Sequence, residues 1–89
     1  MNMKLWNFLE RAQGIENKAL HIENYMMEVD ENDGMEFHFI EINVEDADSE
    51  TMEASYRVEA NTHEEMEKQA RFILNEYFPD ENVATFDLY

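Results

Sequence analysis

The chain has 89 residues, 22 acidic and six basic, with a formal net charge of −16. This length suits one domain, residues 1–89, and the charge excludes direct binding to nucleic acid or to anionic membranes, which are recognised by Lys and Arg. The absence of cysteine excludes disulfides and thiolate metal sites, and no apolar run is long enough to span a bilayer, so we expect a cytoplasmic protein.

The first predicted element is a helix, because one apolar stripe recurs at helical spacing. The stripe consists of Leu5, Phe8, Leu9 and Ala12. Gly14 follows the last apolar position and is the expected C-terminal cap. Residues 19–29 then predict a strand whose apolar alternation changes phase once, so we expect a bulge near Asn24 that restores a single inward face.

Residues 30–34, Asp-Glu-Asn-Asp-Gly, predict a hairpin turn between two strands. In the second strand, residues 35–45, the apolar side chains change face between Phe39 and Ile40, which indicates either a bulge or a strand covered on both faces. An acidic loop at 45–50 follows. Residues 52–60 then alternate clearly, with an inward face made of Met52, Ala54, Tyr56, Val58 and Ala60.

A second helix begins at Thr62, which forms a capping box with Glu65, and it ends before Pro79. Its buried stripe consists of Met66, Ala70, Ile73, Leu74 and Tyr77. Residues 84–89 predict a final strand with Ala84, Phe86 and Leu88 on one face. The expected fold class is therefore α+β, an antiparallel β-meander of three to four strands packed with two helices in the order α-β-β-β-α-β.

The candidates for catalysis are His21, His38 and His63, and none lies in a nucleophile or zinc frame. His21 and His38 could be cross-strand neighbours in the first hairpin, where they pack or face water. Two candidate segments do not match the ligand pattern of an EF-hand calcium loop, because Val29 or Arg57 would fall at a ligand position. We therefore expect no enzyme activity, no catalytic residue, no metal site and no cofactor.

The acidic side chains remain as candidates for binding a partner. Same-face strand positions are about 6.6 Å apart, a spacing comparable to that of successive phosphates along a nucleic-acid strand. Fixed rows of carboxylates could therefore occupy a Lys/Arg groove built for DNA or RNA. The predicted partner-binding residues are Glu41, Glu45, Asp46, Asp48, Glu50, Glu53, Glu59, Glu64 and Glu67. The alternatives are a solvated acidic surface without a partner and salt adaptation.

In size, charge and element order the whole chain resembles the nucleic-acid-mimicking inhibitors of phages and mobile elements, such as anti-CRISPR and anti-restriction proteins. This resemblance rests on no diagnostic motif. It implies a stoichiometric inhibitor, monomeric or homodimeric, in the basic site of a host defence nuclease, with a Cas effector as the first expectation. The alternative is a protein-interaction module, an antitoxin or accessory subunit, that binds through Trp6, Phe8 and Tyr89 and uses its acids for solubility.

Overall fold

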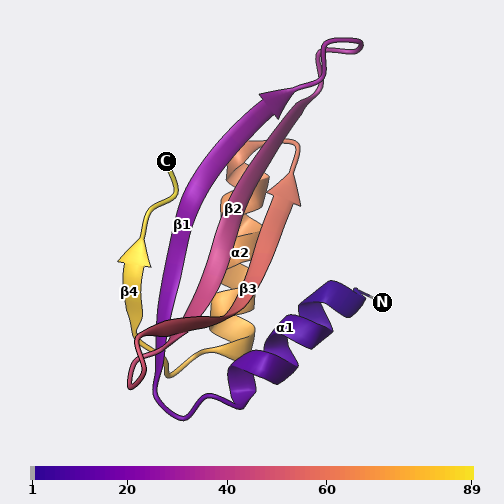
Figure 1. The fold of residues 1–89 in the computed structure, drawn as a ribbon. Helices are drawn as coiled ribbons and strands as arrows, with labels where there is room; N and C mark the ends of the chain where they lie inside the picture. The colour runs from indigo at the N-terminus through magenta and orange to yellow at the C-terminus, as the bar shows by residue number, and fades with distance from the viewer. Residues whose placement is uncertain (1) are drawn as a thin grey trace.

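The computed structural model describes residues 2–89 as two helices and one four-stranded sheet (Figure 1). The elements are α1 (Met3–Gln13), β1 (Lys18–Val29), β2 (Glu36–Asp46), β3 (Thr51–Ala60), α2 (His63–Tyr77) and β4 (Val83–Phe86). The sheet order is β3-β2-β1-β4. β1, β2 and β3 form an antiparallel meander, and β4 pairs with β1 in parallel. The α+β class and the element order are confirmed, with three strands in the meander and a fourth, parallel strand at its edge.

Asn2 caps the start of α1: its side-chain oxygen accepts a hydrogen bond from the Leu5 backbone N–H at 3.1 Å. The helix ends at the predicted place, but Gly14 has a φ of −75° and does not use the left-handed conformation that favours glycine at this position. Ile15, directly after it, is buried and joins Leu9 in the core. The turn after α1 therefore anchors the start of β1.

The predicted bulge in β1 is confirmed at Asn24, which has a φ of 62°. The β1–β2 register shifts between Glu23 and Met26, so one residue is inserted into β1. The insertion returns Met27 and Val29 to the face that carries Leu20 and Ile22, whereas Met26, opposite Phe39, lies on the other face. We call this helix-facing side of the sheet the inner face.

β2 has no inserted residue, since the register shifts insert residues into β1 and β3, and it carries buried side chains on both of its faces. Ile40, Ile42 and Val44 are fully buried on the inner face. On the other face Phe39 is also buried, and the guanidinium of Arg57 lies 4.7 Å from its ring centroid. The apolar residues therefore change face because β2 is the central strand of the meander.

The prediction that Met52 points inward is wrong, because the β2–β3 register shifts after Val44. Ala54 pairs with Val44, whereas Met52 pairs with Glu45, so Glu53 is an inserted residue. Met52 consequently keeps 50% of its surface exposed, while Ala54 is buried as predicted. The bulge turns the start of β3 away from the core.

Both helices contribute to one core on the inner face. In α2, Thr62 Oγ1 accepts the Glu65 N–H at 3.1 Å, as the capping pattern predicts. The helical stripe and the inner-face strand residues meet in a cluster that includes Phe8, Leu9, Ala12, Leu20, Ile22, Ile40, Ile42, Val44, Val58, Met66, Ala70, Ile73 and Leu74. Of the last segment, Leu88 is buried, whereas Ala84 and Phe86 are exposed.

The front of the sheet in Figure 1 is left uncovered, because α2 lies behind β2 and β3, the strands that it contacts. The sheet therefore has one face packed on helices and one face available for other contacts.

Within residues 2–89, neither helix has the length and apolar character needed to cross a membrane.

Candidate protein-binding face

The uncovered side of the meander carries mostly polar side chains, and we call it the open face. The strand registers align Glu23, Glu41 and Arg57 in one row across three strands, and His21, Asn43 and Ser55 in the next row. Glu59 pairs with Phe39 in a further row. The same registers place Met26, Glu28 and Phe37 on this face toward the hairpin turn, and Met52 opposite Glu45. The central part of the open face consists of His21, Glu23, Phe39, Glu41, Asn43, Glu45, Ser55, Arg57 and Glu59.

Two glutamates face each other directly on the open face, because Glu23 pairs with Glu41 across β1 and β2. Like charges in this position destabilise a sheet, unless other groups offset the repulsion. Asn43 supplies one donor: its Nδ2 donates to Glu23 Oε1 at 2.9 Å and lies 3.4 Å from Glu41 Oε1. Asn24 Nδ2 donates to Glu41 at 2.6 Å. The amides hold both carboxylates in place.

Asn43 is the organising residue of this network, since only 6% of its surface is exposed. Its side-chain oxygen accepts a hydrogen bond from Ser55 Oγ at 2.6 Å, so one amide links all three strands of the meander. A buried amide with satisfied donors and acceptors fixes the geometry of its partners. The charged row is therefore rigid at its centre.

His21 holds the next carboxylate of the open face. Its Nε2 lies 3.1 Å from Glu45 Oε1 and its Nδ1 lies 2.9 Å from Thr85 Oγ1, so the ring bridges β2 and β4. The possibility that His21 and His38 are cross-strand neighbours is wrong: His21 pairs with Asn43, and His38 pairs with Met27.

The other two histidines serve the inner side of the sheet. His38 is buried, with Nδ1 2.7 Å from the Tyr25 hydroxyl and Nε2 3.3 Å from Glu36. His63 Nε2 lies 2.6 Å from the Leu88 carbonyl oxygen. Internal partners thus account for the polar contacts of both rings, which tie the hairpin and the C-terminal segment to the core.

The nine predicted partner-binding residues fall into three places. Glu41, Glu45 and Glu59 lie on the open face, and four residues lie in the turn and bulge between β2 and β3, namely Asp46, Asp48, Glu50 and Glu53. Glu64 and Glu67 lie on α2, in the helical layer, where Glu67 pairs with Arg71 at 3.0 Å. The structure thus groups seven of the nine along the meander and separates the two on α2.

The turn acids are partly ordered by their own backbone. Asp46 Oδ1 accepts the Asp48 N–H at 3.0 Å, and Asn17 Nδ2 donates to Asp48 at 3.2 Å. Glu50 adopts a left-handed φ of 57°. Among residues 2–89, no group of three or more histidines and acids is arranged to hold a metal ion.

Sequence reasoning missed Glu23 and the asparagines that hold the open face. Residues 19–60 contain thirteen acids and one Lys or Arg, Arg57, so the excess of charge in the meander was visible. The predicted bulge at Asn24 was the signal that could have found Glu23, because it fixes which side of β1 this residue occupies.

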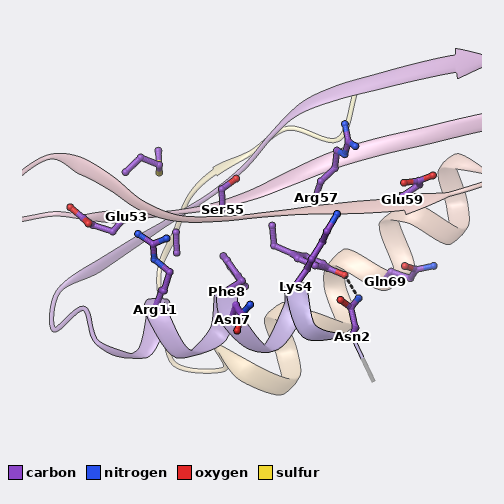
Figure 2. Close-up of a pocket in the computed structure, with 13 residues that line it drawn as sticks. Asn2, Lys4, Asn7, Phe8, Arg11, Glu53, Ser55, Arg57, Glu59 and Gln69 are labelled. Carbon is purple, nitrogen blue, oxygen red and sulfur yellow. Dashed lines mark hydrogen bonds between the residues drawn. The ribbon is translucent and has the colours of Figure 1, made fainter.

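A groove of about 770 Å³ between α1 and β3 has more basic residues relative to its acids than the open face has (Figure 2). Lys4 and Arg11 of α1 and Arg57 of β3 line it, which brings three of the six basic residues together. Glu53 and Glu59 lie toward its two ends in Figure 2. The groove shares Ser55, Arg57 and Glu59 with the edge of the open face, but Lys4 and Arg11 bring it close to charge balance.

In comparisons with protein-family models, curated proteins and solved structures, nothing matches this chain. Within the chain itself, the open face combines a strong excess of one charge with side chains that internal hydrogen bonds hold in place. These two properties make it the candidate functional site.

Proposed function

We propose that the chain is a binding protein, not an enzyme, and that its open face occupies the basic nucleic-acid-binding cleft of another protein. One observation carries this proposal: Glu23, Glu41 and Glu45 are held by internal donors on a face whose one Arg is stacked on Phe39. Fixed carboxylates of this kind can replace phosphates as partners of Lys and Arg.

The rigidity of the open face supports tight binding. A carboxylate that is already held loses little conformational freedom when a partner docks, so more of the interaction energy remains as affinity. The net charge of −16 adds long-range attraction to a positive cleft and raises the association rate. Both effects are typical of a protein that competes with a polyanion.

The target class we propose is a host defence nuclease, with a Cas effector as the first candidate, on the resemblance in size, charge and element order. Such a protein has a long basic cleft that normally holds DNA or RNA. Occupation of that cleft gives stoichiometric inhibition, since each bound copy removes one nucleic-acid site.

Two variants test whether the open face is the contact surface. Each removes the same number of negative charges, from the open face or from elsewhere on the surface. A partner captured from host lysate on the immobilised chain is purified for binding measurements. The open-face variant carries Glu→Gln at Glu23, Glu41 and Glu45. The matched control carries Glu→Gln at Glu10, Glu16 and Glu76, which are exposed and lie outside the open face. We expect at least about tenfold weaker binding for the first variant and less than about threefold for the second. Equal losses would contradict the open face as the contact surface.

Competition with nucleic acid separates the proposal from the interaction module. A mimic is displaced from its partner by duplex DNA or guide RNA, whereas a module with another docking site is not. For the module, Trp6 and Tyr89 are exposed, but Phe8 is 3% exposed and belongs to the core. The expectation that Phe8 is a contact residue is therefore wrong.

A further inference from the structure

The inner face of β1 changes from fully buried to exposed along a single strand. Leu20 and Ile22 have no exposed surface, whereas Met27 and Val29 are 47% and 52% exposed. The alternation of apolar residues continues across this change, because the bulge at Asn24 keeps these side chains on one face. The apolar face of β1 is thus longer than the helical layer that covers it.

The uncovered part belongs to a projecting hairpin, residues 26–37, which we call the arm. β3 ends at Ala60, opposite His38, and α2 begins at His63, so the arm extends past both elements (Figure 1). Met35, at the end of the turn, is also half exposed, but it lies opposite Asp30 in the register and therefore on the other face, as does Met26 opposite Phe39. On the inner face, Met27 and Val29 form a short apolar strip at the point where the helical layer stops.

Acidic side chains border this strip. Glu36 pairs with Val29, and the turn contributes Asp30, Glu31 and Asp33. At the start of α2, Glu64 is exposed as well. An apolar strip bordered by acids is complementary to a helix with one apolar face and flanking Lys or Arg residues. Methionine suits such a contact because its flexible, polarizable side chain adapts to different partners.

We infer that the inner face of the arm binds a basic amphipathic helix of a partner protein, which continues the helical layer beyond α2. A helix fits because helices cover the rest of the same face. This contact goes beyond the open-face proposal, since it uses the opposite side of the sheet and other residues. A second copy of the chain is disfavoured as the occupant by its own charge of −16.

The test uses a synthetic peptide of about 14 residues, roughly 21 Å long as a helix, made of Leu and Lys with all Leu on one face. A control peptide carries Ser in place of Leu and keeps every Lys. Binding to the full chain is measured by calorimetry, and the methionine methyl groups are followed by NMR. We expect the Leu/Lys peptide to bind, with the Met27 signal shifted, and the Ser/Lys peptide to bind at least about tenfold more weakly.

Two variants distinguish binding at the arm from nonspecific attraction of a basic peptide to an acidic protein. Met27→Gln combined with Val29→Thr is expected to weaken binding of the Leu/Lys peptide by about tenfold. Phe72→Gln changes an apolar residue on α2 that is 60% exposed, and we expect no change in affinity. Circular dichroism checks that both variants fold.

Equal affinity of the two peptides, unshifted Met27, or an equal effect of Phe72→Gln would overturn the inference. Sedimentation equilibrium of the free chain supplies the last check. If it shows a dimer that the arm variant dissociates, a second copy occupies the arm and the inference is likewise wrong.

Discussion

The two halves of β1 have the same apolar alternation but different surroundings. In the body of the protein, Leu20 and Ile22 lie beneath the helices with no exposed surface, whereas Met27 and Val29 in the arm are about half exposed on the same face. The difference shows that alternation identifies the apolar side of a strand and leaves open what covers it. In the body the cover is intramolecular, and in the arm we infer that a partner supplies it.

The largest effect that this comparison predicts is on stability. Ile42→Ala removes a fully buried side chain from the body and is expected to lower the free energy of unfolding by about 3 kcal/mol. Met27→Ala in the arm is expected to cost less than about 1 kcal/mol, because much of this side chain is already in water. Urea unfolding of both variants gives the two values, and similar losses would show that the arm is part of the core.

A second prediction compares the open face with an exposed helix surface. Asn43→Ala removes donors from Glu23 and Glu41 and leaves their opposed charges unrelieved, so we expect a loss of about 2 kcal/mol. The loss should decrease at high salt, which screens the repulsion. Asn75→Ala on α2 is the matched control with little expected change. A salt-independent loss would mean that packing alone explains the effect.

The smallest effect concerns local opening. Amide protons of the arm are expected to exchange with solvent faster than those of Ile22 and Ile42, because few buried contacts oppose opening of the hairpin. Hydrogen exchange followed by NMR measures both sets. Protection of the arm equal to that of the body in the free chain would contradict the division of β1 into two regions.

The element order and several local features follow from the sequence because they depend on neighbouring residues. The bulge at Asn24, the cap at Thr62 and the helical stripe of α2 all have short-range signals. The parallel position of β4 and the exposure of Met52 do not follow from the sequence of neighbouring residues. The first depends on which sheet edge remains free, and the second depends on a register shift that only strand pairing defines.

The candidate site was partly predictable for the same reason. The acid excess in the meander identified Glu41, Glu45 and Glu59, which share the open face. Glu64 and Glu67 were placed in the same group because charge alone does not indicate the layer to which a residue belongs. The role of Asn43 depends on partners from two other strands, so no local sequence pattern predicts it.

The parallel pairing of β4 with β1 has a consequence for how the chain folds. Thr85 meets His21 across a separation of 64 residues, and Asp87 N–H bonds to the Ile22 carbonyl oxygen at 2.7 Å. Closing so long a loop costs entropy before any contact forms, and such nonlocal pairing slows folding. During synthesis, this edge of β1 therefore has no β4 partner until residues 83–87 have been added to the chain.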